Sequence, residues 1–428
     1  MIMNLRKANK GITLIALVIT IIILLILSGI SIATITGKNG ILNKANNAKI
    51  ETEKANAKEK VQLAIIGSFG TNGKFDSNTL SKNLEEIEGI NKDKTNLPIE
   101  NLPATVVVDD YLISIDKNGQ VILDGNINDL TMPSTTDTTP FLPEGATIIR
   151  NNLQTGIVIK DENDNEWVWI EVPKSIYGNT TYNGGIAPTN SEDYTKIENV
   201  MKNYAKDYRL NSWKDTFFNT DHSGFTNETE YNDHKNTMLK NVFENGGFYV
   251  GRYEAGTKTE RGSTLVTPII QRDAYPYHYV TCKEAQTLSN QLIVGEKQAS
   301  LMFGIQWDLI MKFVEEKGAK TKEELATDST SFANYKDASF TIKRGLYYNT
   351  YTSWIEILDS YTKPASTEVL LSTGASNRNC TVEIYDLAGN LNEYTLEQSW
   401  SYGSPCSLRG GNYRYNNFSS PILTASRS

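Results

Sequence analysis

The feature that most limits how this chain can fold is a long apolar run near its start. No Asp, Glu, Lys or Arg occurs between Gly11 and Gly37, whereas Arg6, Lys7 and Lys10 precede the run. At about 1.5 Å per residue, a helix of this length spans the roughly 30 Å of hydrocarbon in a bilayer. Because basic flanks stay in the cytoplasm, the run predicts a single-pass membrane protein whose later residues lie outside the cell. A buried helix of a soluble protein is the alternative.

The residues that follow predict a second helix, a small sheet and a linker. Between Ile41 and Ile66, small and apolar residues recur at helical spacing among Lys and Glu. Within a small head at 67–125, two β-rich stretches flank the segment Asp116–Gly119, whose Asn-Gly pair is a strong hairpin signal. Residues 126–143 are rich in Thr, Ser and Pro, which is typical of a linker that buries no core.

A larger domain is expected over residues 144–428. It opens with alternating β runs, and apolar spacing predicts helices within 276–292 and 300–318. The stretches 174–241 and 361–381 lack clear periodicity and are expected to be mostly loops, apart from one short helix in the first. Together with the small sheet, this pattern predicts an α+β protein.

Charge and metal-binding residue types exclude several functions. The net charge of −8 argues against nucleic acid as a partner, because a phosphate-binding surface needs a basic face. The cysteines allow at most one disulfide bridge; they are Cys282, Cys380 and Cys406. The histidines lack metal-ligand spacing; they are His222, His234 and His278.

The last residues are unusual in what they lack. From Ser401 to Ser428 there is no Lys, Glu, Gln, Met or Trp. Tyr rings provide rigid contact area, and Asn and Arg provide hydrogen-bond donors, so the segment predicts a surface for a protein or glycan ligand. The candidate ligand-binding residues are Tyr402, Asn412, Tyr413, Arg414, Tyr415, Asn416, Asn417 and Phe418. The alternative is that the same rings fill the core.

The start of the chain resembles a type IV prepilin. The stretch KGITLIALVITIIILLIL is similar to that family's pattern of a basic leader, Gly, an apolar residue and Thr-Leu-Ile-Glu. The resemblance implies that a prepilin peptidase removes a leader (1–11) by cleavage between Gly11 and Ile12. The new amine would be methylated, and a pilin-like helix would cover 12–66. Ala16 stands where the family has a Glu that neutralises a neighbouring amine. Because an unpaired buried amine is costly, the resemblance implies a tip subunit or an anchor, with other pilin subunits as candidate partners.

Five later blocks resemble the formylglycine-generating-enzyme-like, or sulfatase-modifying-factor, domain, a variant of the C-type-lectin fold. In order they are GGFYVGRYEAG, YVTCKEAQ, LMFGIQWDLIM, DLAGNLNEYT and LRGGNY, and the resemblance covers about 146–428. The enzymes of that family carry a copper-binding cysteine pair before Ala-Ala-Arg-Ser, where this chain has Ser419 and Thr424. Hydroxyls do not bind Cu(I) as thiolates do, so neither copper nor enzymatic activity is expected.

The block DLAGNLNEYT also matches a calcium-binding block of that family. The implied Ca²⁺ ligands are the side chains of Asp386 and Glu393 and the backbone carbonyls of Gly389 and Leu391. The alternative is an ordinary turn with a capping Asp and a solvated Glu. In GRYEAG, Arg252 and Glu254 are expected to form a structural ion pair in the sheet.

These features favour a non-catalytic, exported, pilin-like surface protein that displays an adhesin-type binding domain at the cell surface or a pilus tip. The residue usage of the last segment also resembles the targets of diversity-generating retroelements, with chance avoidance of charge in a loop as the alternative. Two other functions stay open. One is a formylglycine-generating-type oxidase, and the other is a structural minor pilin of a type IV pilus or secretion pseudopilus.

Overall fold

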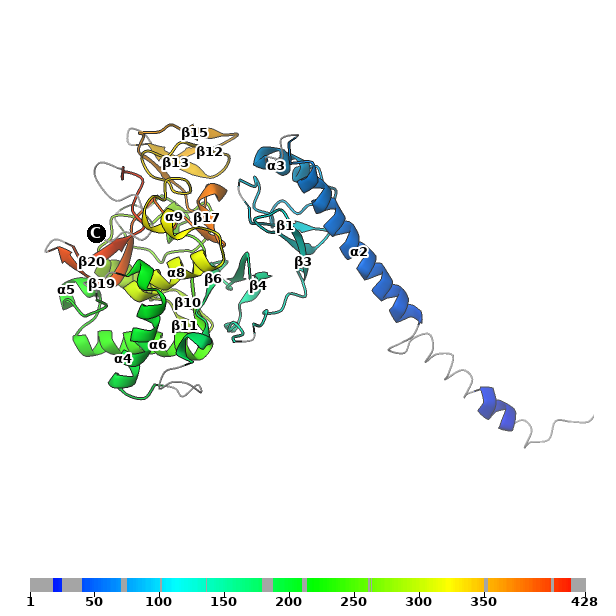
Figure 1. Cartoon of the computed structure of the whole chain (residues 1–428), viewed down its shortest axis with the longest axis horizontal. Helices are drawn as coiled ribbons and strands as arrows, with labels where there is room; N and C mark the ends of the chain where they lie inside the picture. The colour runs from blue at the N-terminus through cyan, green and yellow to red at the C-terminus, as the bar shows by residue number, and fades with distance from the viewer. Residues whose placement is uncertain are drawn as a thin grey trace, which may run out of the picture. The chain divides into compact units, whose positions relative to one another are not determined.

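The chain divides into two compact units, Met1–Lys60 and Val61–Ser428. The computed structural model describes residues 18–24, 41–70, 75–100, 102–135, 137–178, 188–209, 214–260, 262, 264–349, 353–401 and 404–416. The described residues of the first unit are helical, and every strand that the structure describes lies in the second unit. The whole is a mixed α+β structure with many small antiparallel sheets (Figure 1), as the sequence predicts.

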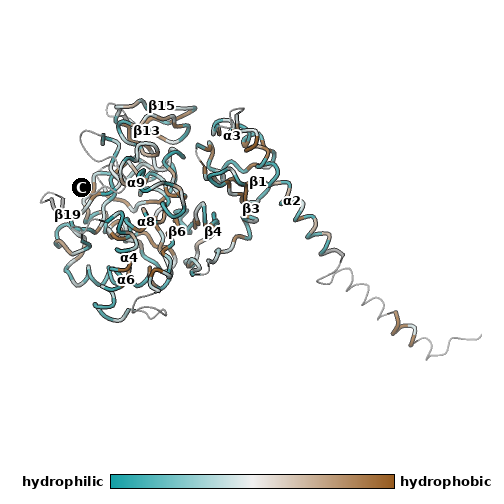
Figure 2. Tube along the Cα trace, in the orientation of Figure 1, coloured by the Kyte–Doolittle hydropathy of each residue, from teal (hydrophilic) through white to brown (hydrophobic). Residues whose placement is uncertain are grey.

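Of the apolar run at the start, the structure describes only residues 18–24, which are helical and hydrophobic (Figure 2). Across the described ranges, no helix is both long and apolar enough to cross a membrane. The predicted processing site, Gly11 and Ile12, lies outside the described residues, as does Ala16. The membrane-spanning helix therefore stays a prediction.

The second predicted helix is confirmed as α2, Ile41–Ile66. Near its end, Val61, Ala64 and Ile65 are buried, and their i, i+3, i+4 spacing places them on one face of the helix. Helix α3, Ser77–Glu85, follows.

The predicted small sheet is also present, with three antiparallel strands in the order β1-β2-β3. Strands β1, β2 and β3 are Ala104–Val108, Tyr111–Ile115 and Val121–Asn126. The predicted Asn-Gly turn joins β2 to β3, and Gly119 takes a positive φ of 79° there. The first hairpin turn was not predicted. Asp109 and Asp110 form it with φ of 50° and 64°, a conformation that Asp tolerates better than most residues.

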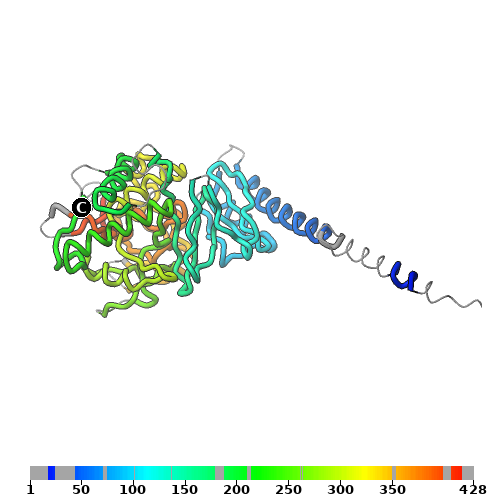
Figure 3. The backbone as a smooth tube through the Cα atoms, turned by 90° about the horizontal axis from the view of Figure 1, so that it is seen from below, coloured from blue at the N-terminus to red at the C-terminus, as the bar shows by residue number. Residues whose placement is uncertain are grey.

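Polar contacts join this sheet to the next one in the second unit. The amide of Asn152 donates to Asp124 Oδ1 at 2.6 Å. The hydroxyls of Ser114 and Thr155 lie 3.3 Å apart. The small sheet accordingly lies beside β4, Thr147–Asn152, in both views of the backbone (Figures 1 and 3).

The largest sheet has four antiparallel strands in the order β4-β5-β6-β7. Strands β5, β6 and β7 are Gly156–Lys160, Glu166–Glu171 and Gly247–Gly251. One face carries Val168 and Val250, which are buried in the main apolar core. The opposite face, which includes Trp167, packs in a smaller apolar cluster.

Helices complete the main core. Helix α7, Cys282–Ser289, and helix α8, Gly304–Glu316, confirm the two predicted helices. The predicted apolar stripe of α8 is fully buried, with Trp307, Ile310 and Val314 at most 1% exposed.

Two stretches expected to be loops contain regular structure. Residues 174–241 hold α4, Ser191–Tyr204, and most of α6, Glu228–Asn245. Both helices begin at an Asn cap, Asn190 and Asn227, whose side chain accepts a backbone N–H. Helix α4 contains Met201 and lies where the one short helix of this stretch was expected. Asn is typical of loops by composition but is also among the best N-cap residues, so the prediction of loops was wrong for α6.

Short strands likewise replace the predicted loop at 361–381. Their stability comes from pairing partners elsewhere in the chain, which a single segment does not show. The remaining short elements are α5 (Thr220–Ser223), α9 (Lys322–Ala326), β8 (Gly256–Thr257), β9 (Tyr275–Pro276), β10 (Ile293–Val294), β11 (Lys297–Gln298), β12 (Phe340–Ile342), β13 (Leu346–Asn349), β14 (Ile355–Glu356), β15 (Tyr361–Lys363), β16 (Val369–Leu371), β17 (Cys380–Thr381), β18 (Ile384–Tyr385), β19 (Glu393–Ser401) and β20 (Ser404–Arg409).

Candidate functional site

A buried network of ion pairs anchors the strand that leads into the C-terminal segment. This arginine cluster consists of Arg209, Asp215, Asp308, Glu397 and Arg409. Arg209 places Nη1 2.7 Å from Asp308 Oδ2 and Nη2 3.0 Å from Asp215 Oδ2. Arg409 places Nη2 2.5 Å from Asp308 Oδ1 and Nε 3.7 Å from Glu397 Oε2. The cluster therefore ties β20 to β19 and α8.

The charges of this cluster support one another. Burial alone would lower the pKa of the Arg209 guanidinium, but the carboxylates of Asp215 and Asp308 outweigh that effect and raise it. Asp215 also accepts the backbone N–H groups of Gly304 and Ile305, at 2.6 and 3.1 Å. It thereby satisfies amides in the first turn of α8 that have no partner inside the helix.

After β20 the chain makes a double-glycine turn and enters the candidate binding segment. Gly410 and Gly411 have φ of 78° and 76°, a region that favours glycine. The hydroxyl of Tyr335 donates to the carbonyl of Gly410 at 2.6 Å. Tyr413 N–H then donates to the carbonyl of Asn390 at 3.0 Å. The segment is held by its backbone, as a rigid binding surface requires.

The structure separates the predicted ligand-binding residues into buried and exposed members. Tyr413 is only 8% exposed, so its ring belongs to the packed layer and does not face outward as expected. Tyr415 is half-buried against the main core. The side chain of Arg414 is 55% exposed, with Nε 3.0 Å from the Tyr413 hydroxyl and 3.8 Å from Glu368 Oε2. Asn412 and Asn416 are half-buried.

Only part of the candidate surface can be placed. Tyr402, Asn417 and Phe418 lie outside the described residues, as do Ser419 and Thr424.

The predicted metal-binding block forms a tight, packed turn. Asp386, Gly389 and Asn390 all have positive φ, at 55°, 77° and 59°. A Cβ at Gly389 would come within 2.5 Å of the carbonyl oxygen of Asn334, so only glycine fits that position. Gly389 N–H donates to the carbonyl of Gly410 at 3.1 Å, which links this turn directly to the start of the candidate binding segment.

Three carboxylates gather at this turn, and we call them the acidic turn: Glu254, Asp386 and Glu393. Asp386 accepts Gly374 N–H at 2.7 Å and the amide of Asn379 at 3.1 Å. Burial raises the pKa of Asp386 to about 6. Burial and then neighbouring carboxylates raise the pKa of Glu254 and of Glu393 well above their usual values.

The hydrogen bonds of the acidic turn leave one oxygen unsatisfied. Glu254 accepts the backbone N–H of Leu391 at 2.9 Å and the amide of Asn390 at 2.6 Å. Oε2 of Glu393 is shielded from solvent, yet no described residue hydrogen-bonds to it. An unsatisfied buried carboxylate oxygen fits the presence of a cation. Within the described ranges, however, no three His, Cys, Asp or Glu side chains are grouped closely enough to hold a metal ion.

Glu254 is the site residue that sequence reasoning missed. The expected pair with Arg252 was wrong, because Arg252 forms its ion pairs with Glu166 and Glu383. Glu254 instead reaches the turn that contains Leu391. The sequence signal that could have pointed to Glu254 is its position as an acidic residue soon after strand β7.

A disulfide bond cross-links two of the elements that precede the candidate binding segment. Cys282 at the start of α7 is bonded to Cys406 on β20, with a Cα–Cα distance of 6.5 Å. Such bonds persist in oxidising compartments, so the bridge hints at an extracytoplasmic domain. The third cysteine, Cys380, is a free thiol, and burial raises its pKa to about 12.

Comparison of the chain with protein-family models, with curated proteins and with solved structures finds no match.

Proposed function

We propose that this chain is a non-catalytic, exported, pilin-like surface protein that displays a C-type-lectin-fold domain for binding a protein or glycan ligand. The observation that carries the proposal is the C-terminal arrangement. A strand locked by a disulfide and by five buried charges leads into a short segment whose Arg414 side chain is 55% exposed. A rigid scaffold that presents an exposed Arg beside half-buried Asn and Tyr groups suits recognition, because little conformational entropy is lost on binding.

The cysteine chemistry supports a binding function over oxidase chemistry. Cys282 and Cys406 are bonded to each other. The raised pKa of Cys380 keeps that thiol protonated at neutral pH, whereas copper binding and nucleophilic attack need a thiolate. Copper-dependent oxidation of a cysteine-containing peptide by the purified chain would revive the oxidase alternative.

The pilin-like part of the proposal rests on the apolar run and on the elements that follow it. A long helix, α2, and a three-stranded sheet come after the run, the order expected of a pilin-like anchor and head. Mass spectrometry of the native protein should show Ile12, N-methylated, as the first residue. Mature protein that begins at Met1 would contradict processing by a prepilin peptidase and leave an uncleaved membrane anchor.

We also propose that the acidic turn holds Ca²⁺. Asp386 and Glu393 would supply carboxylate oxygens, and Gly389 and Leu391 would supply carbonyl oxygens. Ca²⁺ prefers such hard oxygen ligands. Its charge would remove the need for protonated carboxyls, and its role would be structural, holding the turn that bonds to Gly410.

The binding surface can be tested with paired variants of the full chain. Arg414→Ala should leave the circular dichroism spectrum unchanged and reduce binding to glycan and extracellular-matrix arrays by about tenfold, as expected for a charged contact of about 1.4 kcal/mol. Lys322→Ala is the matched control, because Lys322 is a surface cation of similar exposure on α9. A folded Arg414→Ala chain that binds like wild type would place the binding site elsewhere.

A further inference from the structure

Within the part of the chain that the structure describes, one edge of strand β7 pairs with no other strand. The sheet order β4-β5-β6-β7 places it at the end of the sheet. Arg252 N–H bonds to the carbonyl of Glu166, and Val172 N–H bonds to the carbonyl of Gly246. The register between these two bonds is unbroken, with Val168 opposite Val250.

That register decides which backbone groups point outward. Hydrogen-bonded pairs alternate with non-bonded pairs in an antiparallel ladder, so Phe248 and Val250 bond to β6. The N–H and C=O groups of Gly247, Tyr249 and Gly251 therefore point away from the sheet. No strand among the described residues pairs with this edge.

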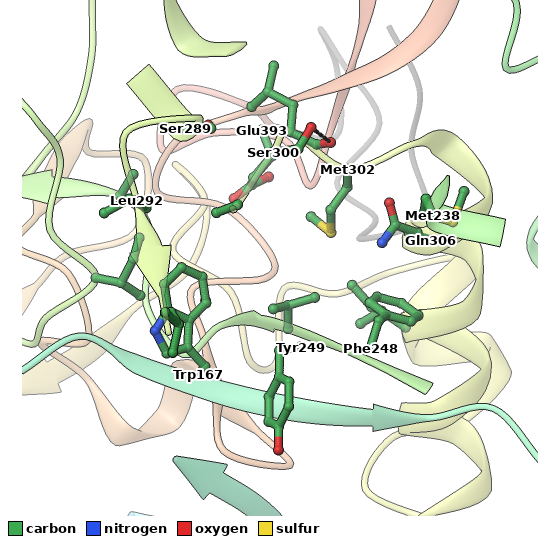
Figure 4. A pocket seen from close by; sticks show the side chains of 18 of the residues that line it. Trp167, Met238, Phe248, Tyr249, Ser289, Leu292, Ser300, Met302, Gln306 and Glu393 are labelled. Atoms are coloured by element: carbon green, nitrogen blue, oxygen red, sulfur yellow. Dashed lines mark hydrogen bonds between the residues drawn. The ribbon is translucent and has the colours of Figure 1, made fainter. Parts of the chain in front are cut away.

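A cavity of about 750 Å³ runs along the same edge, and all five residues of β7 line it. Its wall includes side chains from both faces of the sheet. Trp167 and Leu292 lie on one side of the opening in Figure 4, and Phe248 and Met238 lie on the other. The volume is within the roughly 300–1,000 Å³ of typical ligand sites.

Three unsatisfied polar atoms also belong to residues of this wall, and one of them is Oε2 of Glu393 in the acidic turn. Trp169 is 3% exposed, and its Nε1 has no hydrogen-bond partner among the described residues. Oδ1 of Asn392 is likewise buried without one. Both residues line the cavity, so an occupant with a carbonyl and an N–H group would satisfy them.

We propose that this groove binds an extended segment of a partner protein, which adds to β7 as a fifth strand of the sheet. A peptide backbone offers N–H and C=O groups at the spacing of Gly247, Tyr249 and Gly251, which is about 6.8 Å per two residues. Main-chain bonds of this kind give affinity, and side-chain pockets on alternate positions give specificity.

The walls define the chemistry of the partner segment. Side chains at alternate positions would lie against Trp167 and Leu292, and those between them against Phe248 and Met238. Because these four wall residues are apolar, the segment carries consecutive Val, Ile or Leu residues where it passes them, like a strand buried on both faces. About five such residues match the length of β7.

The free protein allows a first test by amide hydrogen exchange. In the full chain, the amides of Phe248 and Val250 should exchange slowly, and those of Tyr249 and Gly251 should exchange at least about tenfold faster. Equal protection of all four would show that the edge is already covered, and would overturn the proposal. If Tyr249 and Gly251 lose protection only on dilution, the occupant is a second copy of the chain, which also overturns it.

The probe for binding is the fluorescein-labelled peptide KKVIVLVKK, whose lysines give solubility and suit a chain of net charge −8. Fluorescence anisotropy with the full chain should show saturable binding, together with new protection of Tyr249 and Gly251. N-methylation of alternate apolar residues in the peptide should weaken binding by about tenfold or more, because the donors to one edge are lost. No binding of the unmodified peptide, or equal binding of the N-methylated peptide, would overturn the proposal.

Two variants at one position separate the backbone from the side chain. Tyr249→Pro removes the ring and, from the backbone, only the outward N–H group. It should weaken peptide binding by about tenfold while the amides of Phe248 and Val250 stay protected from exchange. Tyr249→Val also loses the ring but keeps the N–H, and should bind within about threefold of wild type. If both variants bind equally weakly, the Tyr249 ring and not the strand edge holds the peptide, and strand addition is wrong.

Discussion

The chain holds two groups of carboxylates in different surroundings: those of the arginine cluster are buried, whereas in the acidic turn Asp386 is buried and Glu254 and Glu393 are half-buried. In the arginine cluster, Asp215, Asp308 and Glu397 are balanced by two guanidiniums at ion-pair distance. In the acidic turn, burial comes first among the effects on each carboxyl group, and it raises all three pKa values. The two groups differ in their nearest partners: guanidiniums lie at ion-pair distance from the carboxylates of the arginine cluster, whereas Asp386 and Glu254 accept hydrogen bonds from amides.

The two groups meet at the β19–β20 hairpin. Glu393 and Arg409 are directly opposite in that ladder, where side chains usually interact. Arg409 nevertheless forms its ion pairs with Asp308 and Glu397. The hairpin thus places the ion-paired arginine cluster beside the acidic turn, whose carboxyl groups have raised pKa values. Each of the two groups can be changed separately by mutation.

The largest expected effect comes from removing a cation of the arginine cluster. Arg409→Met should lower the free energy of unfolding by about 3–5 kcal/mol, because it leaves Asp308 and Glu397 buried with less compensating charge. Urea unfolding of the full chain measures this. Arg414→Met, on an exposed Arg of the same segment, is the control. A loss below about 1 kcal/mol for Arg409→Met would show that the cluster is not the anchor of β20.

At the acidic turn, the raised pKa of Asp386 is expected to make the free energy of unfolding depend on pH. The folded-state pKa of Asp386, about 6, exceeds its ordinary value of 3.8, so the folded state holds the proton more tightly. With chelator present, this contribution is complete below about pH 4 and is lost as pH rises through 6. Its size is on the order of 3 kcal/mol.

Unfolding free energies at a series of pH values, compared between wild type and Asp386→Asn, isolate this contribution. The variant cannot titrate at this position, so the difference between the two curves should change between pH 4 and 7. Parallel curves would mean that the pKa of Asp386 is the same in the folded and the unfolded protein.

Calcium should remove much of this pH dependence and raise stability. At a free concentration of one hundred times its Kd, a ligand that binds only the folded state adds about 2.7 kcal/mol. Differential scanning fluorimetry in Ca²⁺ and in chelator measures the corresponding rise in Tm. The double variant Asp386→Asn with Glu393→Gln should show no rise. Identical wild-type melting in both buffers would make the block an ordinary turn.

The smallest stability effect is expected at the surface. Arg414→Ala should change the free energy of unfolding by no more than about 0.5 kcal/mol, although it should weaken ligand binding. Tyr413→Ala should instead destabilise the domain by a few kcal/mol, because the ring is buried. Thermal denaturation of the two variants side by side distinguishes a surface residue from a packing residue within one short segment.

Local signals in the amino-acid sequence were enough to predict several elements. Helix α2, the Asn-Gly hairpin at Gly119 and helix α8 each depend on residues within a few positions of one another. Helical periodicity and turn residues express the same short-range sterics and hydrogen bonding in any protein. The acidic residues of the block Asp386–Glu393 could likewise be singled out from that block alone.

Only the tertiary structure decided which distant residues meet. It brought Glu254 to the turn at Asp386, joined Cys282 to Cys406 of three cysteines, and buried Tyr413 where an exposed ring was expected. Such contacts depend on the packing of whole elements that lie far apart in the chain, and side chains of equal polarity compete for each place. A local sequence pattern does not show which distant side chains compete for the same contact. The contacts of the acidic turn and of the binding segment are therefore decided only when the strands pair.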